Sequence, residues 1–225
     1  LLGRGLEALE TLVLDVWRRT IGTEPADTSF VGQLQRRLPA VYALHPEFAE
    51  ASASIGKHTF LSFDELVRRA GEIEAALHRP PTIFAHGDFN MDNVIFDEDA
   101  ARVRFIDLHR SGPADYVQDL TVFMVSNFRL RVVDPVIRHR IHKVMSGTLA
   151  FGRRWARECG DPDFEPRVTL GLARSFATSS RFVMERRFSR QLFLRARYLL
   201  ERLVEASDRD GGLSGFELPA EALSE

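Results

Sequence analysis

The sequence lacks several features that would indicate a particular compartment. It holds one cysteine, Cys159, so no disulfide can form within the chain, and a cytoplasmic location is expected. No apolar run approaches the roughly eighteen residues of a membrane span, and nothing at the start resembles a signal peptide. We therefore expect no membrane partner.

The sequence also lacks a large excess of charge of either sign, and it lacks a complete phosphate-binding loop. The net charge of the 225 residues is −2 and 44% of them are hydrophobic, which is typical of a globular protein and argues against nucleic acid as a partner. Gly3 and Gly5 lack the preceding strand and the third glycine of a phosphate loop, so they indicate only a helix start. Lys57, one of two lysines, is expected at an exposed loop position, not against a phosphate.

The densest group of polar residues lies between residues 82 and 107, among three short apolar runs: Ile83–Ala85, Val94–Phe96 and Val103–Ile106. Asp88 and Asn93 are five residues apart after the first run, and Asp107 closes the third. Phosphoryl transfer to a hydroxyl needs a carboxylate that accepts the hydroxyl proton, and oxygen ligands that hold Mg²⁺ on the nucleotide. Protein kinases space these groups in the same way. The pattern predicts Asp88 as the catalytic base, with Asn93 and Asp107 as the metal and cofactor ligands.

A β-hairpin with a polar loop is the alternative interpretation, because Asp and Asn are also turn formers. Residues 97–99 fit that description and are expected to form a solvated tip between the second and third strands.

The order of the polar residues also carries a family resemblance over about forty residues, from Thr82 to Leu120. The motif is His86-Gly87-Asp88-x-x-x-x-Asn93, then Ile106-Asp107, then Gly112-x-x-Asp115-x-x-x-Asp119-Leu120. It resembles the aminoglycoside phosphotransferase and choline kinase-like family. The resemblance implies ATP or another NTP and Mg²⁺ as cofactors. It also implies a small acceptor with a hydroxyl group, such as an aminoglycoside, choline, a sugar or an amino-alcohol.

The resemblance assigns structural roles beside this chemistry. It implies that His86 packs under the loop and hydrogen-bonds its backbone, and a buried, satisfied histidine is also the default after an apolar strand. It implies that Asp119 holds the loop backbone, although a solvated helix acid is the alternative there. The role of Asp115 stays open.

Apolar spacing predicts helices in most of the remaining chain. They are expected over residues 2–20, 30–38, 62–78, from 113 onward, 134–160, 164–185 and 190–207. Pro39 is expected to stop the second helix, and Pro113 to begin the fourth. Ser62 and Glu65 form a capping box at the start of the third.

The fold class predicted is α+β, mainly α: a protein-kinase-like C-terminal lobe with a small β-element that carries the catalytic loop, embedded in helices. We divide it into an N-terminal helix and irregular connection (1–61), a catalytic core (62–130), a helical subdomain (131–210) and a frayed tail (211–225). Residues 1–60 show helical spacing where a nucleotide-binding β-lobe would show alternating strands. That N-terminal small lobe is expected on a longer parent chain, unless it was removed or never existed.

Two functions remain open at this point. With a small lobe, the chain is the catalytic and acceptor-binding part of a small-molecule kinase. Without one, it is a non-catalytic binding or scaffold module. The presence of Asp88, Asn93 and Asp107 together favours the kinase, because a decayed enzyme has no chemical need for all three.

The charge of the C-terminal helices bears on the acceptor. Residues 134–209 hold sixteen Lys or Arg against nine Asp or Glu, and Arg167, Arg174 and Arg181 recur every seven residues. Such a stripe would repel a polycation and attract carboxylate or phosphate, so a neutral or anionic acceptor is expected. A solvated basic surface, or one that faces a partner lobe, is the alternative.

Overall fold

The computed structural model describes residues 2–55, 58–209 and 211–224, and its chain forms two compact units. The first comprises Leu1–Thr28, His78–Phe164 and Leu223–Glu225, and the second Ser29–Leu77 and Glu165–Ala222. Each unit combines distant stretches of sequence, unlike the four consecutive segments expected above. Lys57 lies outside the described residues.

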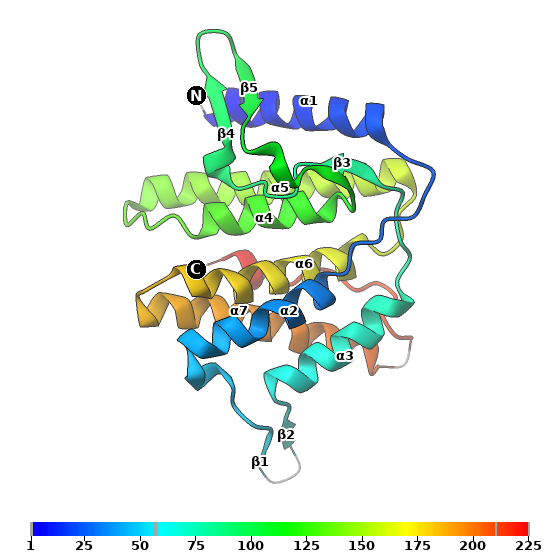
Figure 1. Ribbon diagram of the computed structural model, residues 1–225, viewed down its shortest axis with the longest axis vertical. Helices are drawn as coiled ribbons and strands as arrows, with labels where there is room; N and C mark the ends of the chain where they lie inside the picture. Colours follow the sequence, from blue (N-terminus) through cyan, green and yellow to red (C-terminus); the bar gives the residue numbers. More distant parts are fainter. Residues whose placement is uncertain (1, 56–57, 210, 225) are drawn as a thin grey trace. The chain divides into compact units, whose positions relative to one another are not determined.

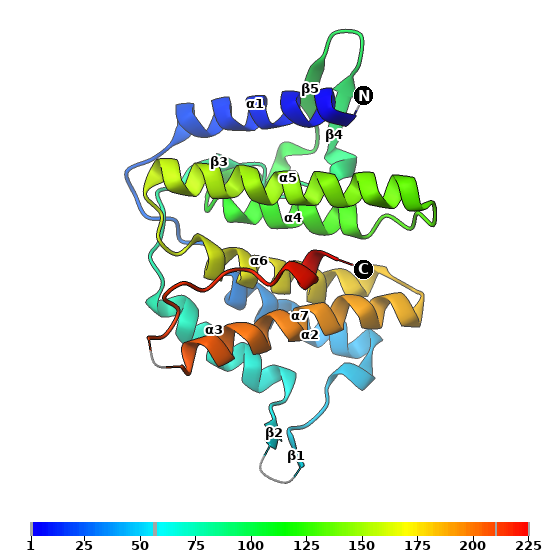
Figure 2. The ribbon, with the colours of Figure 1, turned by 180° about the vertical axis from the view of Figure 1, so that it is seen from behind.

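The helices of the first unit are α1 (Leu2–Thr20), α4 (Val117–Phe128) and α5 (Pro135–Cys159). Figures 1 and 2 show α4 and α5 running side by side. Trp17 of α1 lies in the aromatic core, with ring centroids 5.5, 5.3 and 5.5 Å from those of Tyr116, Phe151 and Trp155. The core thus joins all three helices and fixes the position of α4, whose side chains hold the backbone of residues 86, 87 and 91.

The strands of the first unit form two antiparallel pairs. β4 (Val94–Asp97) and β5 (Arg102–Phe105) form the expected hairpin, with residues 98–101 as its exposed tip. β3 (Ile83–Ala85) pairs with β6 (Gly112–Ala114). Figure 1 shows the hairpin projecting beside α1.

The prediction that a helix begins at Pro113 is wrong. Pro113 lies in β6 opposite Phe84, and α4 begins only at Val117, whose amide donates to the Asp115 carboxylate at 2.9 Å. The pairing partner is far away in the sequence, so local capping signals could not indicate a strand here. Proline is tolerated at the edge of a sheet because its nitrogen has no hydrogen to donate.

The second unit is built from helices and one short hairpin. Its elements are α2 (Phe30–Leu44), β1 (Ala53–Ile55), β2 (His58–Phe60), α3 (Phe63–Ala76), α6 (Phe164–Ser179), of which Phe164 belongs to the first unit, and α7 (Arg186–Ser207). Figure 2 shows α7 lying across α3, which it contacts extensively. The capping box is confirmed at its N-cap, because the Glu65 amide donates to the Ser62 hydroxyl at 3.1 Å.

Three other predictions for the second unit fail. Pro39 lies inside α2, which continues because Val41 is fully buried on the same face as Leu34 and Leu38. The expected helix over 164–185 ends at Ser179, and a 3₁₀ turn (Ser180–Phe182) separates it from α7. The described part of the tail differs from a frayed end, since Leu218 is buried and its amide donates to Glu165 at 2.9 Å.

Among the described residues, no helix is both long enough and apolar enough to cross a membrane.

Candidate active site

The loop between β3 and β4 is held from below by Asp119 in the first turn of α4. Its carboxylate is almost fully buried and accepts the backbone N–H of His86 at 2.6 Å and that of Gly87 at 3.0 Å. A carboxylate that accepts two amides replaces its lost hydration with charge-assisted hydrogen bonds. The structure therefore places Asp119 where the resemblance implies, against the backbone of the loop.

His86 joins the loop to the end of the hairpin. Its ring is buried between Phe89 and Phe105, with centroids 5.6 and 5.8 Å away. Its Nδ1 accepts the Asp88 amide at 3.3 Å, so Nε2 carries the proton and donates to the Ile106 carbonyl at 3.0 Å. Both ring nitrogens are used for structure, which leaves none for proton transfer.

Gly87 gives the loop its turn. Its φ is +80°, and a Cβ at this position would lie 2.1 Å from the carbonyl oxygen of Arg110. The loop and the segment after β5 are therefore in backbone contact, which brings the two halves of the motif together.

Asp88 follows this turn and has 24% of its side chain exposed. Asn90 donates to its Oδ1 at 2.5 Å and Arg110 to its Oδ2 at 3.0 Å. The carboxylate is thus oriented by two neighbours that the sequence analysis missed. The two-residue spacing from Asp88 to Asn90 is typical of a side chain that bonds within its own turn and could have indicated the first. No local signal marks Arg110.

Asn93 connects Asp88 to the hairpin. Its Nδ2 donates to the Asp88 carbonyl at 2.8 Å, and its own carbonyl accepts the Ile106 amide at 3.1 Å. Among the described residues the side-chain oxygen of Asn93 makes no hydrogen bond, so it is open to another partner. Asp107 follows Ile106 in a left-handed conformation, with φ 59° and ψ 53°. These bonds bring the backbone segments that carry Asp88, Asn93 and Asp107 next to one another.

Asp107 is half exposed, and its Oδ1 is paired with Nδ1 of His109, another neighbour not anticipated from the sequence. The second oxygen has no hydrogen-bond or ion-pair partner in the part of the chain that the structure describes. Exposure and an open oxygen leave this carboxylate accessible to a cation.

The residues present fit a hard cation such as Mg²⁺. The described residues contain no cluster of three or more His, Cys, Asp or Glu side chains placed to hold a metal ion. The available donors are the amide oxygen of Asn93 and the carboxylate of Asp107, both hard oxygen ligands. Mg²⁺ usually takes one or two such protein ligands and completes its shell with water and substrate phosphates.

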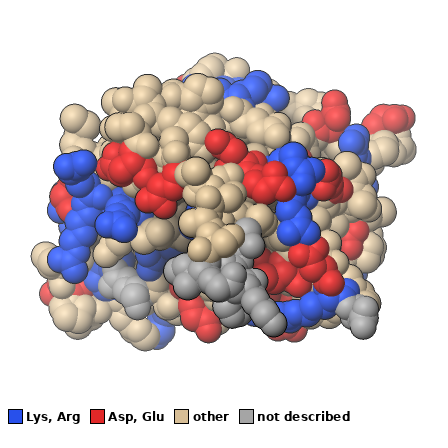
Figure 3. Space-filling model, turned by 90° about the horizontal axis from the view of Figure 1, so that it is seen from below, with Lys and Arg blue, Asp and Glu red and all other residues tan. Residues whose placement is uncertain are grey.

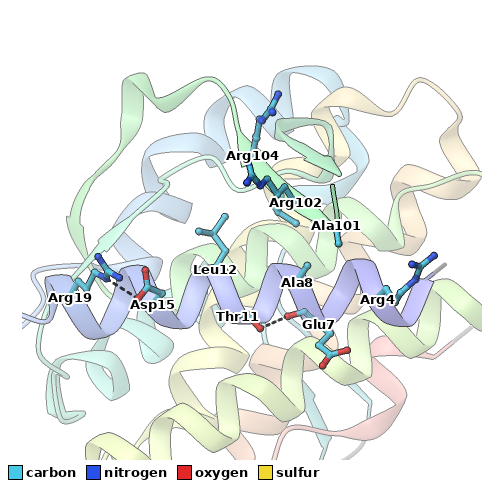
Figure 4. Close-up of a pocket in the computed structure, with 11 residues that line it drawn as sticks. Arg4, Glu7, Ala8, Thr11, Leu12, Asp15, Arg19, Ala101, Arg102 and Arg104 are labelled. Carbon is cyan, nitrogen blue, oxygen red and sulfur yellow. Dashed lines mark hydrogen bonds and ion pairs between the residues drawn. The ribbon is translucent and has the colours of Figure 1, made fainter. Parts of the chain in front are cut away.

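A separate groove of about 660 Å³ lies between α1 and β5. Figure 4 shows Ala8 and Leu12 of α1 directed toward β5, which carries Arg102 and Arg104. Neither the loop nor Asp107 lines this groove, so it is not the place of the predicted chemistry.

A model of the phosphotransferase enzyme family matches residues 12–159, about two thirds of the chain. The chain belongs to the phosphotransferase enzyme family. The match covers all three candidate catalytic and metal-binding residues of this family member. No curated protein matches it.

Among solved structures, this phosphotransferase family member is similar to a glucosamine kinase in complex with glucosamine, ADP and inorganic phosphate. The TM-score is 0.51 at 16% identity, over 91% of this chain and 55% of the other. For a second crystal form of glucosamine kinase the TM-score is 0.51 at 16% identity, over 89% of this chain and 52% of the other. For an aminoglycoside phosphotransferase, APH(3'')-Id from Streptomyces rimosus ATCC10970, the TM-score is 0.41 at 23% identity, over 76% of this chain and 62% of the other.

These structural likenesses concern the fold. The phosphotransferase family member shares with glucosamine kinase a mainly helical, kinase-like arrangement, and it spans about half the length of the glucosamine kinase chains.

Proposed function

We propose that this chain is the catalytic and acceptor-binding part of an ATP- and Mg²⁺-dependent phosphotransferase that acts on a hydroxyl group of a small compound. One observation supports the proposal: hydrogen bonds from Asn93 to the Asp88 carbonyl and from the Ile106 amide to the Asn93 carbonyl link the segments that carry the proposed base and the proposed metal ligands. This combination suits in-line transfer of a phosphoryl group, in which positioning and charge neutralisation supply most of the catalysis.

Each residue has a distinct task in this proposal. Asp88 orients the acceptor hydroxyl through its carboxylate and takes up the proton as the hydroxyl oxygen attacks phosphorus. Asn90 and Arg110 hold that carboxylate in place. Asn93 and Asp107 would hold Mg²⁺, which when bound neutralises charge on the nucleotide phosphates.

Two exposed apolar side chains beside the metal ligands support a nucleotide. Ile95, two residues after Asn93, and Ile106, directly before Asp107, are 48% and 44% exposed. Apolar surface of this kind next to polar ligands suits the flat face of a base, whether from ATP or another NTP. The rest of the nucleotide site is proposed to come from an N-terminal small lobe on a longer parent chain. The complete protein is proposed to act in the cytoplasm.

The acceptor is proposed to be a neutral or anionic hydroxyl compound, such as a sugar. The glucosamine kinase structure contains an amino sugar with ADP, which supports a sugar hydroxyl as the acceptor for a protein of similar fold, but not a neutral or anionic charge on it. The arginine stripe gives less support than expected, because Arg167 and Arg174 are 4% exposed and Arg174 packs over the Phe30 ring. Two of the three arginines therefore serve the interior of the second unit.

A non-catalytic binding or scaffold role is the second candidate. It is favoured by the pairing of both carboxylates with side chains of the same segment, Asp88 with Arg110 and Asp107 with His109. With these pairs formed, both carboxylates are held by protein side chains, as they would be in a scaffold without bound metal.

The roles of the two acids can be separated in the complete protein. Asp88→Asn is expected to abolish turnover with little change in nucleotide affinity, because the base acts on the acceptor proton. Asp107→Ala is expected to weaken Mg²⁺-dependent nucleotide binding as well, because the ligand carries phosphate charge. Steady-state phosphorylation and calorimetry of both variants give the comparison, with Asp99→Asn at the exposed hairpin tip as control. Equal and mild effects of both substitutions would contradict these roles.

A further inference from the structure

A second pocket lies wholly within the second unit, between the 3₁₀ turn Pro46–Phe48 and the first half of α7. Its volume is about 490 Å³, within the range of roughly 300 to 1,000 Å³ typical of small-ligand sites. It is lined by Glu47, Phe48, Glu50, Arg186, Arg187, Arg190, Phe193, Leu194 and Arg197. Four guanidinium groups thus face two carboxylates. Figure 3, a view from below, shows a group of basic side chains at the left beside a group of acidic ones.

The guanidinium groups of two of these arginines have no protein partner among the described residues. Arg186 lies 3.6 Å from Glu47, and Arg197 binds Glu201 and the carbonyl of Leu61. Across residues 2–55, 58–209 and 211–224, by contrast, the guanidinium groups of Arg187 and Arg190 make no hydrogen bond or ion pair. Arginines three and four residues apart repel one another on a helix. Both arginines are exposed, so neither guanidinium group is used to hold the fold and both are open to a ligand.

The base of the pocket is apolar and rigid. The rings of Phe48 and Phe193 are stacked, with centroids 4.2 Å apart and planes 12° apart, and both are buried. Leu194 adds a side chain that is 48% exposed beside the arginines. A ligand here can place an oxyanion on the guanidinium groups and an apolar part on Leu194.

We propose that this pocket binds a small organic oxyanion, a carboxylate or phosphate monoester that carries an apolar or aromatic group. Guanidinium groups bind the paired oxygens of either anion in a bidentate manner, and Arg187 and Arg190 are available to do so. The proposal is independent of the phosphotransferase activity, because no residue of the pocket belongs to the catalytic loop or to the first unit.

Calorimetric titration of the full chain tests the proposal with four probes: phenyl phosphate, benzoate, inorganic phosphate and benzylamine. We expect phenyl phosphate or benzoate to bind at least tenfold more tightly than inorganic phosphate, and benzylamine not to bind. The stronger of the two aromatic anions distinguishes a phosphate ester from a carboxylate. Failure of both to bind, or equal binding of benzylamine, would overturn the proposal.

Variants locate the binding. Arg187→Gln with Arg190→Gln is expected to weaken the aromatic anion at least tenfold. The control Arg202→Gln removes one positive charge from the same helix outside the pocket, where Arg202 pairs with Glu205. It should change the affinity less than twofold. Leu194→Ala should weaken the aromatic anion alone. Asp88→Asn should have no effect. Binding that survives the double substitution, or that Arg202→Gln reduces equally, would place the anion elsewhere and overturn the proposal.

Discussion

Gly87 adopts a φ of +80° beside the carbonyl of Arg110, and that one residue sets the approach of the catalytic loop to the segment after β5. A side chain there meets both a backbone conformation that L-residues avoid and a backbone oxygen that cannot rotate away. Gly112 lies two residues after Arg110. A Cβ added there would have no atom within 4 Å, and its φ is not positive. The two glycines form a natural matched pair.

Gly87→Ala is therefore expected to destabilise the protein by about 3 kcal/mol, since left-handed strain and a fixed clash add. Gly112→Ala should change the unfolding free energy by less than about 1 kcal/mol. Urea denaturation followed by circular dichroism measures both. Equal midpoints for the two variants would mean that the loop is not constrained as described.

The reaction fixes the types and spacing of the residues it needs, so the sequence alone can propose Asp88, Asn93 and Asp107, whose catalytic and metal-binding roles stay predictions. Arg110 was not anticipated, because it reaches Asp88 only through the fold of the chain, 22 residues away in the sequence. His109 lies two residues after Asp107, a local contact that was overlooked. Arg167 and Arg174 show the opposite error, since a periodic charge was taken for a surface feature and the structure buries it.

At the scale of elements, features that depend on residues within one helical turn were predicted well. Features that depend on a partner distant in the sequence were not. The Ser62 cap depends on residues three apart and is present. β6 depends on pairing with β3 and was missed. Pro39 normally ends a helix at a cost of about 3 kcal/mol, but burial of Val41 and its neighbours offsets that cost.

A polar link between α2 and α3 makes the second unit sensitive to high pH. The Tyr42 hydroxyl donates to Asp64 Oδ1 at 2.8 Å. Burial, and then the hydrogen bond to this carboxylate, raise the pKa of Tyr42 above its ordinary value. Above about pH 10 an unfolded tyrosine loses its proton while the folded one keeps it, so stability must fall as pH rises.

Tyr42→Phe is expected to flatten the loss of unfolding free energy between pH 9 and 11, because it removes the group whose ionisation favours the unfolded chain. Denaturant midpoints of wild type and variant across this range provide the measurement. If both proteins lose stability equally, Tyr42 does not carry the pH dependence.

At the scale of the whole molecule, the chain spans about half the length of the glucosamine kinases it resembles. Within the described residues of the first unit, strands occur only as two short pairs, and neither is the multi-stranded sheet that covers nucleotide phosphates in kinases. Among these residues, only the Asn93 and Asp107 side chains and the exposed Ile95 and Ile106 are proposed to contact a nucleotide.

The chain alone is accordingly expected to bind Mg²⁺-ATP weakly, with a dissociation constant above about 1 mM, because one or two metal ligands and an apolar surface supply little affinity. Calorimetry of the chain with ATP and Mg²⁺ checks this. Micromolar affinity would show that these residues form a complete nucleotide site.

Formation of a phosphate ester by the complete protein tests the central claim most directly. Mg²⁺-ATP is incubated with sugars, hydroxy acids, amino-alcohols and kanamycin-like polycations, and the products are identified by mass spectrometry and ³¹P NMR. We predict a phosphorylated hydroxyl on a neutral or anionic acceptor, with no product from Asp88→Asn. A product formed equally by Asp88→Asn, or efficient turnover of polycations alone, would contradict the account.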